Sequence, residues 1–283
     1  MYLVLIATVT ITVFTVGIYK FDWDNSYSRK LIQLIPFPQA LVNSEFIPLN
    51  AAELRLSAYK SAILSQSLYD FSTLEGQKNI AEQKHMIANE LIREKIIANL
   101  LKQNHQEVSN QELNEYYNYL VYKFGKKNPH EEIERTFGLN DEEFRDTIVL
   151  PQLREAKLRL SVLDNKNRAL DIRSGLTTDN FVKTAKMESD DLDTKYIGGD
   201  LGFHYYQELD PWVAAEARNL EVGQISYPIA TPEGWRIIML TAKDEKIHPV
   251  KIQLSQIFIK STDFAKYLDS QKSNFRILVF KNF

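Results

Sequence analysis

The chain has 283 residues, of which 44% are hydrophobic and 25% are charged, and its formal net charge is -3. A chain of this length predicts about two domains, and its slightly acidic balance provides no basic field for nucleic acid. The sequence contains no cysteine, which excludes disulfides, thiolate metal sites and thiol catalysis.

The N-terminal segment is apolar. Residues 1–19 carry no charged side chain, and Lys20 ends the run. At about 1.5 Å of rise per residue, a helix of this length spans roughly 28 Å, close to the apolar thickness of a bilayer. A cleaved signal peptide is the alternative, but the start is not basic and the segment 15–17 is a poor cleavage site. We expect an uncleaved membrane anchor at residues 1–20, contacting the membrane through residues 1–19, and a tether at 21–39.

The next region, residues 40–164, is predicted to be helical. Apolar residues recur at helical spacing along 79–103. Ser109 with Glu112, and Asn140 with Glu143, have the spacing of capping boxes that open two further helices. Pro151 is expected to kink the last of them.

The C-terminal region, residues 165–283, has a different pattern. Short β-branched runs predict strands at 201–206, 225–230, 235–242, 250–260 and 275–280. A helix is expected to begin at Asp210-Pro211, so this region is predicted to be α+β. We expect the tail, a helix near 262–272 and the strand at 275–280, to extend the sheet or to cover its edge.

Four motifs of the helical region resemble the N-terminal chaperone domain of SurA-like folding factors. They occur in the family order, and their sequences are VNSEFI at 42–47, NELIREK at 89–95, VSNQE at 108–112 and FGLNDEEF at 137–144. The resemblance implies an all-α chaperone region at 40–164.

The C-terminal region is similar to the parvulin (PpiC) type of peptidyl-prolyl isomerase, so the chain resembles the SurA- and PrsA-like extracytoplasmic family. The resemblance rests on the segments DNFVKTA at 179–185, SDD at 189–191, GGDLGF at 198–203 and GWRII at 234–238. It implies a parvulin-like antiparallel sheet with helices in residues 165–283.

One family strand is displaced. Parvulins begin with a strand that resembles residues 250–260, yet here this segment follows strand 235–242. In the family the two strands are antiparallel neighbours, so the displaced strand needs only the loop 243–249 to form a hairpin. We therefore expect a circularly permuted parvulin-like domain.

The resemblance also assigns candidate site residues. The positions of the two family histidines carry Gln256 and Arg236, and the family acid matches Asp191. The resemblance implies that Asp191, Arg236 and Gln256 occupy the catalytic positions of a degenerate site. Arg236 beside Asp191 is also open to interpretation as an ion pair that replaces the histidines.

Five residues are expected to bind the client chain. Leu209 and Val213 occupy the family positions of the methionine and phenylalanine that line the proline pocket. The complete set is Phe203, Leu209, Trp212, Val213 and Trp235. The histidines share no ligand spacing, so neither a metal site nor a cofactor is expected.

Three functions follow from this interpretation. The first is a single-pass protein of the cell membrane, with most of its chain outside the cytoplasm, that binds unfolded or proline-containing polypeptides without efficient isomerisation. The second is an active peptidyl-prolyl cis-trans isomerase, and the third is a non-catalytic adaptor for one folded partner. The substitutions to Gln256 and Arg236 favour the first. No nucleic acid is expected as a partner, and the oligomeric state stays open.

Overall fold

The computed structural model describes residues 2–21, 23, 25–66, 70–124, 128–246, 249–261 and 264–281. Contacts divide the chain into two compact units. The first comprises Met1–Asn99, His130–Thr147 and Gln271–Phe283, and the second comprises Leu100–Pro129 and Ile148–Ser270. This division differs from the boundaries expected at residues 20, 39 and 164, which stay predictions.

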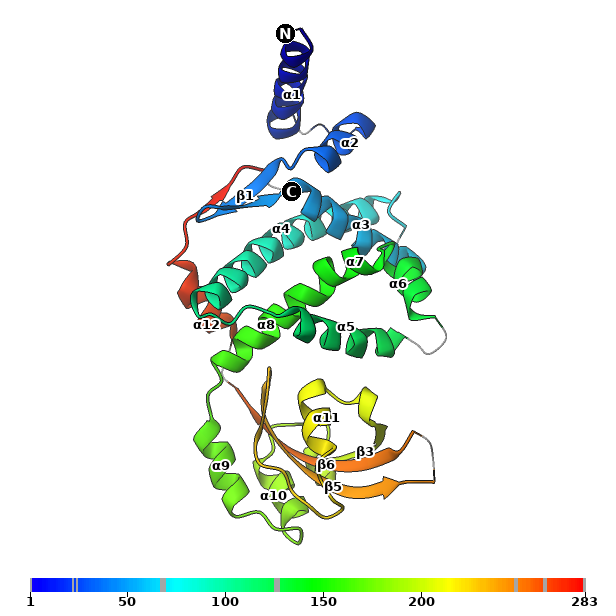
Figure 1. The fold of residues 1–283 in the computed structure, drawn as a ribbon, viewed down its shortest axis with the longest axis vertical. Helices are drawn as coiled ribbons and strands as arrows, with labels where there is room; N and C mark the ends of the chain where they lie inside the picture. The colour runs from blue at the N-terminus through cyan, green and yellow to red at the C-terminus, as the bar shows by residue number, and fades with distance from the viewer. Residues whose placement is uncertain are drawn as a thin grey trace. The chain divides into compact units, whose positions relative to one another are not determined.

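The first unit combines helices with a small sheet (Figure 1). Its strands β1 (Pro38–Val42), β2 (Glu45–Pro48) and β7 (Ile277–Val279) form an antiparallel sheet in the order β2-β1-β7. Its helices are α1 (Tyr2–Lys20), α2 (Ser26–Leu34), α3 (Leu49–Ser65), most of α4 (Leu74–Gln103), α6 (Pro129–Phe137) and α7 (Asp141–Phe144).

The N-terminal run forms the helix α1, as its sequence predicted. Among the described residues, no helix combines the length and the apolar character that crossing a bilayer requires.

The π-helical turn η1 (Arg145–Val149) interrupts the helix that starts at Asp141, where Pro151 was expected to cause a kink. Pro151 has no N–H, so the Thr147 carbonyl four residues earlier cannot form its usual helical hydrogen bond. Arg55 of α3 donates to that carbonyl at 2.8 Å. The same guanidinium forms a two-pronged ion pair with Glu94 of α4, at 2.5 and 2.7 Å.

The second unit contains α5 (Asn110–Phe124), α8 (Leu150–Ser161) and the parvulin-like fold. The helices of this fold are α9 (Lys166–Ser174), α10 (Phe181–Glu188), α11 (Pro211–Ala217) and the 3₁₀ turns η2 (Lys195–Ile197) and η3 (Tyr206–Glu208). Its strands are β3 (Asp200–Tyr205), β4 (Ile229–Thr231), β5 (Gly234–Asp244) and β6 (Lys251–Lys260). The helix α12 (Phe264–Lys272) follows, so the α+β class is confirmed.

The four strands form an antiparallel sheet in the order β3-β6-β5-β4. Strand β6 therefore lies between β3 and β5, although it is the last of these four strands along the chain. It pairs with β5 from Gly234↔Lys260 to Asp244↔Lys251, which confirms the expected hairpin. The strand expected at 225–230 begins later than predicted, because β4 starts at Ile229 and residues 225–228 precede it.

Each face of this sheet packs against a different set of helices (Figure 1). Ile238, Leu240, Ile252 and Leu254 form one core with α11. Ile237, Met239, Ile257 and Ile259 form the other with α9 and α10. The side chains along β5 and β6 alternate between the faces, so neighbours in sequence belong to different cores.

The expectation that the C-terminal strand extends the parvulin-like sheet is wrong. Strand β7 belongs to a different sheet. It pairs instead with β1, with Leu41 opposite Leu278, and the Asn43 side chain accepts from the Arg276 amide at 3.0 Å. The small sheet gains its third strand from the far end of the chain.

Candidate functional site

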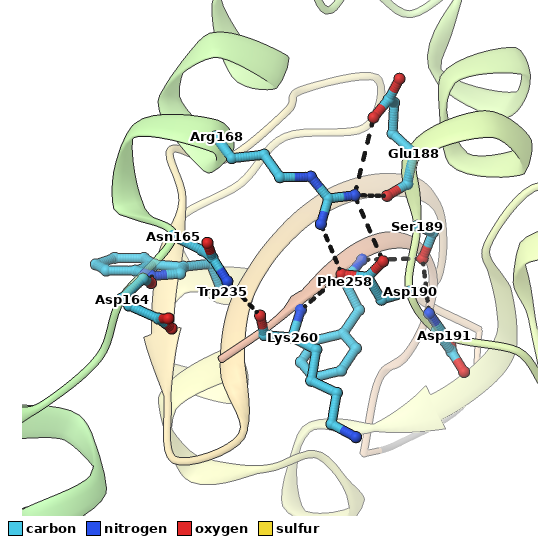
Figure 2. Close-up of polar contacts among 10 residues, drawn as sticks. All are labelled: Asp164, Asn165, Arg168, Glu188, Ser189, Asp190, Asp191, Trp235, Phe258 and Lys260. Carbon is cyan, nitrogen blue, oxygen red and sulfur yellow. Dashed lines mark hydrogen bonds and ion pairs between the residues drawn. The ribbon is translucent and has the colours of Figure 1, made fainter. Parts of the chain in front are cut away.

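The segment 189–191 is held to the end of β6 by one backbone hydrogen bond and by two hydrogen bonds from β6 amides to its side chains. The Asp190 amide donates to the Phe258 carbonyl at 2.7 Å, and the Phe258 amide donates to the Ser189 hydroxyl at 3.1 Å. The Lys260 amide donates to the Asp190 carboxylate at 2.9 Å (Figure 2). These bonds fix where the next residue, Asp191, leaves the sheet.

Arg168 of α9 holds the same segment from its other side (Figure 2). Its guanidinium donates to the Asp190 carboxylate at 2.8 Å and to the Glu188 carbonyl at 2.8 Å. Burial acts to raise the pKa of Asp190, but the bonds from Arg168 and the Lys260 amide outweigh it and hold this pKa below its ordinary value. Asp190 is therefore an anchor for the loop, and Asp191 is the acid of this loop that contacts Gln256.

The structure brings the three predicted catalytic positions together in one hydrogen-bonded row. Gln256 of β6 donates through Nε2 to Asp191 Oδ2 at 2.7 Å. Arg236 of β5 donates through Nη1 to Gln256 Oε1 at 2.6 Å. The amide of Gln256 is thus oriented by an acceptor on one side and a donor on the other.

The side-chain amide of Gln256 therefore links the Asp191 carboxylate to the Arg236 guanidinium. Its side chain is only 5% exposed, and the Arg236 guanidinium also lies 4.7 Å from the centroid of the Phe258 ring. The Nε of Arg236 is buried and has no hydrogen-bond partner among the described residues. The row is a fixed polar network rather than a direct contact between two charges.

The environment of Asp191 favours its ionised form. Burial is the largest influence and raises the pKa of the carboxyl. Hydrogen bonds from Thr194, Gln256 and the Asp193 amide, with the positive charge of Arg236, outweigh burial, so the pKa lies below its ordinary value. Asp191 is therefore a carboxylate at neutral pH and accepts hydrogen bonds rather than donating them.

A glycine allows the acidic loop to approach β6. Gly199 has a φ of +80°, and a Cβ at this position would lie 2.0 Å from the Gln256 carbonyl oxygen. The Gly199 carbonyl accepts a hydrogen bond from the backbone N–H of Gln256 at 2.8 Å. The first part of the GGDLG motif thus fixes the backbone of the residue that contacts Asp191.

The five predicted client-binding residues do not form one surface. Leu209 and Val213 are 7% and 4% exposed, because they belong to the core beneath α11. Trp235 packs with the core on the opposite face, and its indole N–H donates to the Asp164 carbonyl at 2.7 Å. Phe203 on β3 is 49% exposed. Trp212 lies near Tyr116 of α5, with ring centroids 6.2 Å apart. Their role in binding stays a prediction.

Three participants in the site did not emerge from sequence reasoning. Thr194 donates to Asp191, Phe258 carries the Arg236 guanidinium on its ring, and Arg168 clamps Asp190. The sequence does contain a signal for Thr194, because this residue lies three residues after Asp191 in a turn. Arg168 has none, since it reaches Asp190 from a separate helix.

A match to a family model defines the class of the domain. Residues 157–242 match the family model described as "Rotamase: PPIC-type PPIASE domain". The model ends before β6, so the central strand of the sheet lies outside the matched residues. The chain thus carries a parvulin-type domain.

Curated relatives extend the likeness. The chain is 33% identical over 133 residues to "Foldase protein PrsA 2" of Bacillus anthracis, which covers 44% of this chain and 47% of that protein. It is 37% identical over 87 residues to "Chaperone SurA" of Nitrosococcus oceani, which covers 31% of this chain and 18% of that protein. The chain therefore matches less than half of the length of each. These matches confirm the recognition made from the sequence, a SurA- and PrsA-like protein of the parvulin type.

A solved structure is also similar in sequence. The peptidylprolyl isomerase PrsA from Bacillus anthracis is 22% identical and covers 65% of this chain and 85% of its own, with a TM-score of 0.24. At this TM-score, the likeness carries no weight for the fold, which rests on the strand pairing described above.

Proposed function

We propose that this protein is a membrane-anchored, extracytoplasmic folding factor that binds unfolded or secreted polypeptides, and that its parvulin-type site isomerises prolyl bonds poorly or not at all. The family match and the relatives named as a foldase and a chaperone support the folding role. The observation that carries the statement about chemistry is the Asp191–Gln256–Arg236 row.

The physical argument concerns protons and charge. Prolyl isomerisation lowers a rotation barrier of about 18–20 kcal/mol by weakening amide resonance, and no bond is broken. The family resemblance implies two histidine rings at the heart of this site. An amide and a guanidinium stand there instead, and neither takes up nor releases a proton near neutral pH. Gln256 is held by both Asp191 and Arg236, and Arg236 is held by Gln256, so their reorientation toward a client costs hydrogen bonds.

Residual isomerase activity is the second candidate. The Arg236 guanidinium is a fixed positive charge, and Asp191 is a fixed negative one two hydrogen bonds away. A preorganised field of this kind stabilises a transition state without any proton transfer. This candidate requires that Asp191→Ala abolish catalysis.

The test combines two measurements on the same preparations. NMR exchange spectroscopy on a proline peptide measures cis-trans interconversion, and light scattering measures suppression of client aggregation. We expect wild-type protein to suppress aggregation with little acceleration of exchange, and Asp191→Ala to change neither. Acceleration that Asp191→Ala abolishes would instead establish an isomerase. Stoichiometric binding of one folded partner, with no effect on unfolded clients, would establish an adaptor.

A gain-of-function variant sharpens this test. Gln256→His with Arg236→His returns both rings to the family positions. If the site lacks only its rings, exchange should accelerate markedly over wild type, and Gln256→Asn with Arg236→Lys serves as the matched control. No acceleration in a folded double-histidine variant would indicate that the proline pocket itself is absent, which agrees with the burial of Leu209 and Val213.

The circular permutation belongs to the same proposal. It is supported by the central place of β6 in the sheet, its position after β5 in the chain and the family match that ends at residue 242. A variant that moves residues 249–261 ahead of residue 176, with a short linker, restores the family order. We expect this variant to fold with the same sheet, as judged by backbone NMR.

The membrane anchor is tested by fractionation. Full-length protein is expected to sediment with membranes and to resist extraction by carbonate. Deletion of residues 1–20 should release it into the soluble fraction. If most of the chain is extracytoplasmic, an external protease should digest it in cells whose outer layers have been removed and whose cell membrane is still intact. Soluble full-length protein would overturn the anchor.

A further inference from the structure

The small sheet of the first unit is apolar on both of its faces. Ala40 and Ile47 are paired across β1 and β2 and point to the inner face, where they are 1% and 3% exposed. The next residues along each strand point the other way. Leu41 pairs with Phe46 of β2 and with Leu278 of β7, so these three side chains form a row across all three strands.

This row is open to solvent. Phe46 and Leu278 are 48% and 40% exposed. Phe280 lies two residues beyond Leu278, is 45% exposed, and donates its amide to the Gln39 carbonyl of β1 at 2.9 Å. We call Leu41, Phe46, Leu278 and Phe280 the outer face. Large apolar side chains gathered on one exposed face mark an interaction surface.

Two hydrogen bonds hold the sheet against the last turn of α1. The Tyr19 hydroxyl donates to the Pro38 carbonyl of β1 at 2.6 Å. The Lys281 ammonium donates to the Ile18 carbonyl at 2.6 Å, and the Ile18 side chain is fully buried. The sheet therefore lies directly at the C-terminal end of α1. Because α1 is the proposed membrane anchor, the sheet is expected at the membrane surface.

The charges around the outer face fit an anionic bilayer. Arg276 and Lys281 flank the apolar residues of β7, and the segment 276–281 contains no carboxylate. Glu45, beside Phe46, is neutralised by Lys95 at 3.2 Å. Apolar and aromatic side chains flanked by cations suit the interfacial layer, where rings lie at headgroup level and cations meet anionic lipid.

A second copy of the chain fits this face less well. Two copies joined antiparallel through β7 would bring Arg276 of one copy near Lys281 of the other, since a two-fold contact uses the same patch twice. Like charges directly opposite each other are destabilising. The cations thus favour a lipid surface as the occupant.

We propose that the outer face lies in the interfacial layer of the anionic bilayer that holds α1, so that the first unit lies on the membrane surface. The inference rests on the proposed membrane anchor. It adds a second membrane contact and fixes which side of the small sheet faces the lipid.

The test uses single cysteines, because the chain has none of its own. Phe46→Cys and Leu278→Cys place a fluorescent NBD label on the outer face of the full chain. Val279→Cys is the matched control, since it is the next residue of β7, is 50% exposed and points to the opposite face. Each protein is reconstituted into vesicles of phosphatidylcholine and phosphatidylglycerol, with or without lipids brominated near the glycerol end of their chains.

We expect the brominated lipids to remove most of the fluorescence at positions 46 and 278 and little at position 279. Equal quenching at 278 and 279, or none at 46 and 278, would overturn the inference. Disulfide-linked dimers of unlabelled Leu278→Cys would instead assign the face to a second copy. A label at 278 that responds to an unfolded client but not to brominated lipid would assign it to clients.

Carbonate extraction of the same vesicles judges the anchor separately. A chain that resists extraction without quenching at the outer face would sink only this inference. A chain that carbonate removes would sink the anchor, and the inference with it. Suppression of client aggregation by the unlabelled wild type, measured in parallel, judges the folding role independently of both.

Discussion

At the scale of single residues, the site depends on the backbone as much as on the side chains. Gln256 meets Asp191 through its side chain, while its main chain pairs with Gly199. The neutral amide occupies a position where the family resemblance implies a ring. Asp191 and Arg236 orient this amide, so a substitution of one of them should also affect the other.

Gly199 and Gly202 provide a matched pair of alanine substitutions. Both have positive φ, of +80° and +73°, so alanine costs each about 1–2 kcal/mol in the left-handed region. Only at Gly199 would the new Cβ collide with a backbone oxygen, whereas nothing lies within 4 Å at Gly202. Urea unfolding should therefore show a clearly larger loss for Gly199→Ala. Equal losses would contradict the close approach.

Asp191 should make the stability of the second unit depend on acid. Its folded-state pKa lies below the unfolded value of about 3.9. The stability contributed by its hydrogen bonds is fully present above that unfolded value, and it is lost as the pH falls through the folded pKa. The free energy of unfolding of wild type should therefore exceed that of Asp191→Asn at pH 6. This difference should shrink at pH 3. A difference independent of pH would show that the bonds do not depend on ionisation.

At the scale of elements, one arginine joins three helical segments of the first unit. Arg55 of α3 contacts Glu94 of α4 and the carbonyl that Pro151 leaves without its helical partner. The two side chains are 13% and 22% exposed. Burial raises the pKa of Glu94, and the charge of Arg55 opposes this rise. The pair therefore stabilises only while both partners are present.

Arg55→Met should cost the first unit about 2–4 kcal/mol, because it leaves a largely buried carboxylate and a carbonyl without their donor. The double variant Arg55→Met with Glu94→Met should recover most of this loss, since apolar side chains of similar volume replace both charges. Thermal unfolding of the two variants measures the difference. A double variant no more stable than the single one would contradict the view that the unpaired carboxylate causes the loss.

At the scale of the whole molecule, the two ends of the chain depend on each other. Strand β7 completes the sheet that β1 and β2 begin, and Lys281 donates to the Ile18 carbonyl of α1 at 2.6 Å. The parvulin-like fold lies between these ends in sequence. Its own sheet is complete without β7.

Removal of residues 274–283 should therefore loosen one sheet and spare the other. We expect faster amide exchange in β1 and β2, because β1 loses its partner on one side. Exchange in β5 and β6 should stay unchanged. Hydrogen-exchange mass spectrometry on the truncated and full chains compares the two sheets directly. Faster exchange in β6 would mean that the tail supports the parvulin-like sheet after all.

Local signals in the sequence were sufficient for several elements. The capping box at Ser109 forms with Glu112, and that at Asn140 forms with Glu143. The strand expected at 250–260 occurs as β6 at 251–260. Side chains alternate along β5, so the neighbours Trp235 and Arg236 must face opposite ways. The sequence alone therefore indicated that Trp235, a predicted client-binding residue, does not share a face with Arg236.

The sequence by itself determined the elements and the class of the domain, because caps, turns and strand patterns depend on neighbours within a few residues. Only the tertiary structure decided which distant groups meet. Gln256 lies between Asp191 and Arg236, Arg168 clamps Asp190, and β7 joins β1 instead of the larger sheet. Each of these contacts brings together residues from separate elements, and chain packing rather than local spacing sets that distance.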